Sequence, residues 1–181
     1  KGGAQLVRFL RPRLEAALKA DDDFELINLF HRNGPFADRL YAGTELLLKV
    51  AEAHRRLGFP IESARLFQSL IRDSKAEAFH DVALMGLGDS YLEQKDMRAA
   101  RAVFERYRLQ FPVGRFAGQA LIGILTSFEG EGNTPGLVKL GKQWLIHNPR
   151  HPDRALVQLK VADALRQAKR DAEAAPLYES V

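Results

Sequence analysis

Histidine is the residue type in this chain best suited to catalysis or metal binding, and it occurs as His31, His54, His80, His147 and His151. His147 and His151 are four residues apart, a spacing that places two ligands on one helix face. Pro149 lies between them and interrupts a helix, so we predict no metal site there. The chain contains no Cys, which excludes thiolate ligands, thiol nucleophiles and disulfides.

Two short runs could suggest a ligand site, and both are better interpreted as turns. The run from Glu129 to Gly136 contains glycines, but it follows a predicted helix, lacks a closing Lys-Ser or Lys-Thr, and carries two acids where phosphate would lie. The acidic run Asp21-Asp22-Asp23 is interpreted as a turn between helices. No Ser has the glycine flanks of a nucleophile elbow. We therefore predict no catalytic, cofactor or metal site, and a protein that is not an enzyme.

Length and composition are those of an ordinary globular chain. Its 181 residues are 46% hydrophobic and 28% charged, and 27 Lys and Arg against 23 Asp and Glu give a net charge of +4. No apolar run approaches the roughly 20 residues that cross a bilayer. Basic residues are interspersed with acids, so nucleic acid is not a predicted partner. The chain lacks an initial Met and ends within a helical pattern, so we expect it to be part of a longer protein.

Apolar and small residues recur along the chain with a period of 37 residues. Its clearest copy contains Leu84, Leu87, Gly88, Tyr91, Ala100, Phe104 and Pro112, and 37 residues later stand Leu121, Ile124, Leu125, Phe128, Leu137, Gly141 and Pro149. The register predicts about five units, at 7–43, 44–80, 81–117, 118–154 and 155–181. His54 takes the place of Tyr91 one unit earlier, so a packing role is predicted for it.

Each unit is predicted to be two helices joined by a short turn, because apolar residues recur three and four apart on either side of a breaker. Asp96 and Thr134 are expected as N-caps of second helices, with Pro135 directly after Thr134. No segment alternates as a strand does. Small residues such as Gly88 and Ala100 would let helices approach closely, with Phe104 filling the space beside them. The chain is therefore predicted to be a single all-α repeat domain over 1–181.

The spacing of Leu87-Gly88, Tyr91, Ala100, Phe104 and Pro112 resembles the tetratricopeptide repeat, whose usual length is about 34 residues. The resemblance implies a right-handed α-solenoid of stacked helix-turn-helix repeats. The connections at 111–116 and 148–152 are similar to those of bacterial envelope members, which favours a periplasmic or envelope location over the cytoplasm. Gly141 replaces the usual aromatic residue, and Trp144 is expected to fill its space. Pro12 is expected to kink or to begin the first helix.

The resemblance also implies where a ligand would bind. In such repeats the first helices line a concave groove, with ligand-facing side chains at the second, fifth, ninth, twelfth and thirteenth positions of a unit. The candidate residues are Leu48, Glu52, Arg55, Val82, Met85, Asp89, Leu92, Ile122, Leu159, Asp163 and Arg166. They form an apolar row beside an acidic one. The expected function is a scaffold in a bacterial multiprotein assembly that binds an amphipathic, basic peptide or helix of another protein, with only indirect membrane contact.

Three alternatives stay open at this stage. The basic residues Arg98, Arg101, Arg106 and Arg108 could bind an anionic polymer or a membrane. The chain could be an accessory domain of a larger enzyme. The apolar row could also be covered by further helices of the same protein. The sequence predicts neither the oligomeric state nor the identity of the partner.

Overall fold

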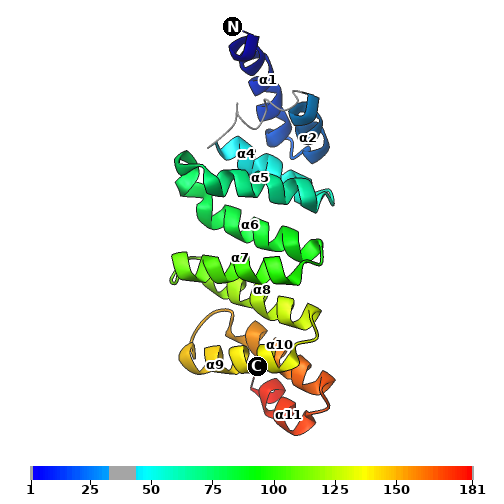
Figure 1. Cartoon of the computed structure of the whole chain (residues 1–181), viewed down its shortest axis with the longest axis vertical. Coiled ribbons are helices and arrows are strands. Elements are labelled where there is room, and N and C mark those ends of the chain that lie inside the picture. The colour runs from blue at the N-terminus through cyan, green and yellow to red at the C-terminus, as the bar shows by residue number, and fades with distance from the viewer. Residues whose placement is uncertain (1, 33–43, 181) are drawn as a thin grey trace. The chain divides into compact units, whose positions relative to one another are not determined.

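The computed structural model describes residues 2–32 and 44–180, and all regular structure in these ranges is helical (Figure 1). The helices are α1 (Gly2–Lys19), α2 (Asp23–Arg32), α4 (Glu45–Arg56), α5 (Pro60–Arg72), the 3-10 helix η2 (Ser74–Phe79), α6 (His80–Glu93), α7 (Met97–Gln110), α8 (Ala117–Gly130), α9 (Thr134–His147), α10 (Arg154–Gln167) and α11 (Asp171–Glu179). The described ranges contain no strand. The prediction of an all-α chain is confirmed.

The helices belong to two compact units, Lys1–Gln94 and Lys95–Val181. In the first unit, α1 packs on α2, α2 on α4, α4 on α5, and α5 on α6. In the second, α7 packs on α8, α8 on α9, α9 on α10, and α10 on α11. Each unit is thus a stack of helices in chain order. That the whole chain acts as one repeat domain stays a prediction.

Helix boundaries recur at the predicted period of 37 residues. The second helix of each pair begins at Asp23, Pro60, Met97, Thr134 and Asp171, and the first helix ends at Lys19, Arg56, Glu93, Gly130 and Gln167. The turn between the two helices therefore has the same length in every pair.

A left-handed residue closes each first helix at the same place in the repeat. Positive φ angles occur at Asp21 (50°), Gly58 (79°), Lys95 (63°), Gly132 (69°) and Lys169 (57°). At Lys169 the backbone N–H groups turn back onto the helix: Lys169 N donates to Arg166 O at 2.9 Å and Arg170 N to Leu165 O at 2.9 Å. These two bonds supply donors to carbonyl oxygens that would otherwise lack a hydrogen-bond partner at the end of the helix.

Because a Cβ is strained at positive φ, glycine is the favoured residue at these turns. We expect Lys169→Gly to raise the free energy of unfolding by about 1 kcal/mol, since the exposed Lys169 side chain makes no hydrogen bond to any described residue. Gly132→Ala places a Cβ at such a position, and we expect it to lower the free energy of unfolding by about 1 kcal/mol. Urea denaturation followed by circular dichroism measures both. Equal stability of all three proteins would contradict a strained turn.

The N-terminal ends of the second helices confirm one predicted cap and correct another. The side chain of Asp96 accepts from Ala99 N at 3.0 Å, as expected. Thr134 is not the N-cap of α9; Asn133 is, and its Oδ1 accepts from Gly136 N at 3.0 Å. Separately, Pro12 lies inside α1 and does not begin it.

Close approach between helices explains where the repeat places glycine and phenylalanine. In the first unit a Cβ on Gly86 would overlap the ring of Phe67, and in the second unit a Cβ on Gly123 would overlap the ring of Phe104. Phe67 and Phe104 are 1% and 0% exposed. An aromatic side chain on a second helix thus fits where the next first helix carries glycine.

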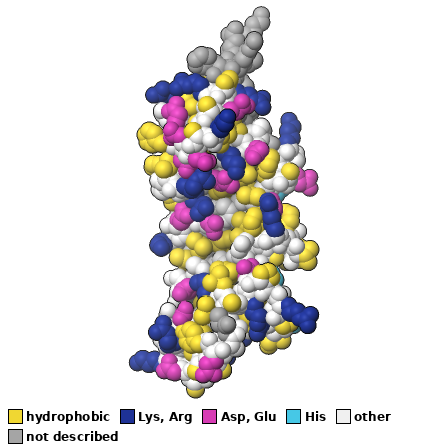
Figure 2. Space-filling view, turned by 180° about the vertical axis from the view of Figure 1, so that it is seen from behind, with side chains coloured by type: hydrophobic (Ala, Val, Ile, Leu, Met, Phe, Trp, Pro, Cys, Tyr) yellow, Lys and Arg dark blue, Asp and Glu magenta, His cyan; other side chains and the backbone are white. Residues whose placement is uncertain are grey.

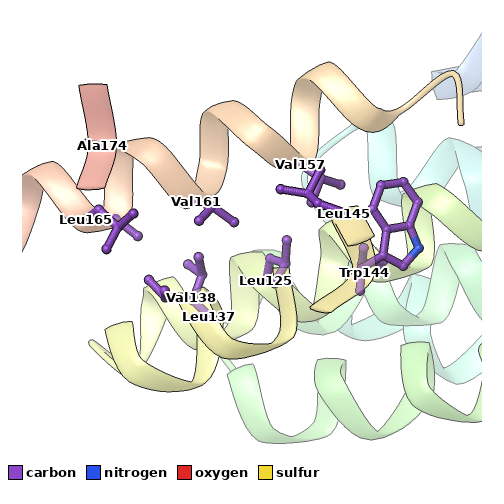
Figure 3. Packing of buried hydrophobic residues seen from close by; sticks show 11 residues of the cluster. Leu125, Leu137, Val138, Trp144, Leu145, Val157, Val161, Leu165 and Ala174 are labelled. Atoms are coloured by element: carbon purple, nitrogen blue, oxygen red, sulfur yellow. The ribbon is translucent and has the colours of Figure 1, made fainter. Parts of the chain in front are cut away.

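The next copy of this contact has glycine in place of phenylalanine. Gly141 occupies the aromatic position on α9, and a Cβ there would overlap Val161 of α10. Val161 fills that space, not Trp144 as expected; the Trp144 ring instead meets His151, with centroids 4.9 Å apart. Figure 3 shows Val157, Val161 and Leu165 directed from α10 toward the buried side chains of α8 and α9.

Candidate functional site

The predicted binding residues of α6 lie on one face of that helix. Val82, Met85, Asp89 and Leu92 are spaced three and four apart, and all four are partly exposed. The other face is buried and includes Leu84. The structure therefore places these four predicted side chains together on an accessible strip of α6.

On α4, the predicted residues Leu48, Glu52 and Arg55 differ in what they offer a ligand. Leu48 is only 5% exposed and belongs to the core, so it presents no accessible side chain. Glu52 is partly exposed and lies 3.3 Å from Lys49 and 3.8 Å from Arg56. Arg55 donates from Nη1 to Glu93 at 2.9 Å. Its Nε is buried and has no hydrogen-bond partner within the described residues.

Asp89 is the carboxylate with the fewest partners on this face. Burial raises its pKa above the usual range, the nearby Arg55 charge opposes that shift, and Glu93 adds to it. Within the described part of the chain, Asp89 makes neither a hydrogen bond nor an ion pair, unlike Glu52. A half-buried carboxylate without a donor is costly, and a donor from a bound partner would offset that cost.

In the second unit, the predicted residues lie on α8 and α10. Ile122 of α8 packs partly against the buried cluster, and Leu159 of α10 is partly exposed. Asp163 accepts from the hydroxyl of Tyr178 at 2.6 Å, a bond that raises the pKa of Tyr178. The exposed Arg166 lies 3.7 Å from Asp163. Asp163 is therefore already paired within the unit.

A cavity of about 870 Å³ opens in the first unit beside α1, the turn after α1, and α4. Arg11, Glu15 and Leu18 line it from α1. Because these residues stand 37 positions before Leu48, Glu52 and Arg55, they are at the fifth, ninth and twelfth positions of their unit.

On its other side the cavity is lined by Glu45, Glu52 and Arg56, which are the second, ninth and thirteenth residues of the unit 44–80. Each wall thus includes three residues at repeat positions predicted to face a ligand, beside lining residues at other positions. Of all the lining residues, Glu52 alone is among the predicted site residues. The same count applied to the unit 7–43 would have identified the α1 residues.

Known proteins match this arrangement of helix pairs. A tetratricopeptide repeat family model matches residues 48–114. Nearly identical TPR-like repeats of a Podosopora anserina protein described as a kinesin light chain share 15% identity, with a TM-score of 0.71 over 96% of this chain and 92% of that one. This is a tetratricopeptide-repeat fold. The resemblance to that superfamily and the predicted all-α solenoid class are confirmed.

Other tetratricopeptide-repeat structures agree. A MamA protein has 11% identity and a TM-score of 0.72, covering 97% of this chain and 90% of that one. MamA residues 41 to the end from Desulfovibrio magneticus RS-1 have 14% identity and a TM-score of 0.72, covering 97% of this chain and 92% of that one. No curated protein sequence matches the chain. The tetratricopeptide-repeat fold is generally that of a protein-interaction scaffold, and its members are typically not enzymes.

The remaining candidate residues take structural positions in this tetratricopeptide-repeat fold. His54 is 1% exposed, consistent with packing, and its Nε2 lies 2.9 Å from Nε2 of His31. His147 Nδ1 lies 2.8 Å from Gln143 O. The described residues contain no group of three or more His, Cys, Asp or Glu placed to hold a metal ion. Among them, no helix is long and apolar enough to cross a membrane.

The basic residues considered as a surface for an anionic polymer are partly paired with acids of the same chain. Both Nη atoms of Arg101 donate to the carboxylate of Glu131, at 2.6 and 3.1 Å, and the guanidinium lies 4.6 Å from the ring centroid of Phe128. Figure 2 shows Lys and Arg interspersed with Asp and Glu over the face that it presents. Nothing in this pattern favours an anionic polymer as the partner.

Proposed function

We propose that this chain is a non-enzymatic scaffold that binds a segment of another protein along the exposed face of its first helices. The observation that carries the proposal is the cavity of about 870 Å³, whose lining includes six residues at the repeat positions expected to face a ligand. The tetratricopeptide-repeat fold supports it, because such folds generally serve protein interaction. A single repeat domain over 1–181 is part of this proposal.

The binding residues divide into an apolar and an acidic set. Met85, Ile122 and Leu159 are partly exposed, so a partner's apolar side chains would gain free energy by covering them. Asp89 offers carboxylate oxygens that no described residue uses. A segment with apolar side chains on one side and Lys or Arg beside them meets both requirements, which is why we propose an amphipathic, basic peptide or helix.

The setting of this interaction rests on resemblance alone. The connections at 111–116 and 148–152 are similar in sequence to those of bacterial envelope members, and we propose a multiprotein assembly of the periplasm or envelope on that ground. In that setting the contact with a membrane would be indirect, through partners. In-cell crosslinking with mass spectrometry would identify the neighbouring proteins.

The apolar set can be tested by Met85→Glu combined with Ile122→Glu. We expect peptides selected by display against the full chain to lose at least tenfold in affinity, because two carboxylates would replace apolar contact surface. Fluorescence anisotropy measures the affinity and circular dichroism checks the fold.

The matched control places the same two changes elsewhere, as Leu109→Glu with Ile146→Glu. Both side chains are highly exposed, at 84% and 76%, and lie outside the proposed binding face. The control is expected to bind as the unchanged protein does. Equal affinity of all three folded proteins would show that this face is not where peptides bind.

A further inference from the structure

The cavity of the first unit is acidic in a chain that is basic as a whole. Six carboxylates and three cations line it, a formal charge of −3, whereas the full chain carries +4. The carboxylates are those of Glu15, Asp21, Asp22, Asp23, Glu45 and Glu52. A concave surface with this excess of one sign attracts the opposite charge.

The cations of the cavity do not neutralise all of its acids. Arg11 Nε binds Glu15 at 2.9 Å, Arg56 holds both oxygens of Asp23 at 2.7 Å, and Lys49 lies 3.3 Å from Glu52. Each lining cation is thus committed to a lining carboxylate.

Three acids of the cavity remain without a cation within the described residues. With the residues that the structure describes, Asp21 and Glu45 make no ion pair, and Asp22 accepts only the backbone N–H of Glu25, at 2.9 Å, as a helix cap. All three side chains are exposed. Among the described residues, Asp21 acts on Arg56 only through its charge, and the cap bond of Asp22 uses one of its two carboxylate oxygens. These carboxylates can therefore still accept from a ligand.

Apart from Thr44, the rest of the lining is apolar. Ala17 and Leu18 of α1, Leu26 of α2 and Leu46 of α4 contribute to it. The volume of about 870 Å³ lies within the roughly 300–1,000 Å³ usual for ligand sites, and it exceeds what one side chain fills. Lys and Arg combine a long aliphatic stem, which such a wall can cover, with a terminal charge.

We propose that this cavity receives a Lys or Arg side chain, flanked by apolar residues, from the bound segment of a partner protein. The proposal rests on the function proposed above and adds a receptor for one side chain within the first unit. The carboxylates of Asp21, Asp22 and Glu45, which form no ion pair with the described residues, hold the charge, and the leucines cover the stem. Because the carboxylates are exposed, binding here weakens as salt rises.

The test removes the free charges while preserving their backbone roles. Asp21→Asn suits a left-handed residue, Asp22→Asn keeps a good N-cap, and Glu45→Gln keeps the length of its side chain. The matched control removes three exposed carboxylates of the second unit, by Glu105→Gln, Asp171→Asn and Glu179→Gln. Both triple variants change the net charge equally.

The probes are peptides selected by display on the unchanged full chain, and a copy of each with its Arg replaced by citrulline or its Lys by norleucine. We expect the selected peptides to be enriched in Lys or Arg next to apolar residues. We expect about tenfold weaker binding to the cavity variant and no change with the control variant. The neutral peptide should bind both variants and the unchanged protein equally weakly.

Two results would overturn the inference. Peptides that bind the cavity variant as tightly as the unchanged protein, yet lose affinity on Met85→Glu with Ile122→Glu, would refute the basic receptor and leave the proposed function standing. Peptides insensitive to both sets of changes would refute the proposed function as well. Selection of uncharged or acidic peptides alone would also refute a receptor for Lys or Arg.

Discussion

Phe104→Ala is expected to lower the free energy of unfolding by about 3–5 kcal/mol, the usual cost of emptying a fully buried aromatic site. Phe104 is 0% exposed, and its ring lies against α8 where Gly123 leaves room for it. The loss would combine the apolar surface returned to water with the cavity left between α7 and α8. Urea denaturation followed by circular dichroism measures it. A loss below 1 kcal/mol would mean that the ring does not hold the two helices together.

Gly123→Ala tests the same contact from the other side. In an exposed helix this change gains up to about 1 kcal/mol, but here the new methyl group would overlap the Phe104 ring, so we expect a net loss of about 1–3 kcal/mol. Combining Gly123→Ala with Phe104→Leu should cost less than the sum of the two single changes, because the smaller side chain makes room. Additive losses would contradict direct contact.

Acid is expected to destabilise the first unit through His54. The side chain is 1% exposed, and its Nδ1 lies 2.8 Å from Val50 O, a carbonyl that can only accept, so Nδ1 carries a proton. Nε2 of neutral His54 then accepts from Nε2 of His31 at 2.9 Å. A second proton on His54 would set two N–H groups against each other and bury a charge.

The direction of the pH effect follows from the pKa of His54. Burial lowers that pKa below 6.5, the backbone bond to Val50 opposes the shift, and the charges of His31 and Arg65 lower it further while Glu62 raises it. The unfolded chain therefore binds a proton at a higher pH than the folded chain. Stability is full above about pH 6.5 and falls as the pH drops toward the folded value, by at most about 1.4 kcal/mol per pH unit for one proton.

The measurement is the free energy of unfolding from urea titrations between pH 7.5 and 5, compared with His54→Leu. The variant is expected to lose the part of the pH dependence that His54 causes, since leucine stands at the equivalent position 165. His147→Gln serves as a control, because it removes an exposed histidine that lies outside the first unit. Identical slopes for His54→Leu and the unchanged protein would contradict the assignment.

The helix boundaries were predictable because they depend on local pattern. Asp96 was identified as a cap from its place before an apolar stripe, and the structure confirms it. Asn133 was missed in favour of Thr134 because both residues are good caps, and the choice depends on whether Gly132 or Asn133 ends the turn. A shift of one residue is beyond what composition distinguishes.

Tertiary contacts were harder to foresee. The repeat count placed Leu48 with Met85, Ile122 and Leu159, yet Leu48 is buried. A repeat count identifies equivalent positions, but it does not identify the side chains that a neighbouring helix packs over them. For the same reason Trp144 was expected where Val161 lies, since the Val161 side chain comes from the following unit. The cavity beside α1 depends on such contacts as well.

The recurring turn also bears on how such a chain can change in length. At Gly58, Gly132 and Lys169 the closing bonds join backbone atoms within six consecutive residues, so the helix ends without help from other parts of the chain. Duplicating or deleting a block of 37 residues would join turns of the same geometry. Every later residue would then keep its position within the repeat. Inserting a single residue inside a helix would instead rotate all the following side chains by about 100°. Growth by whole modules is therefore the evolutionary route that this backbone permits at least cost.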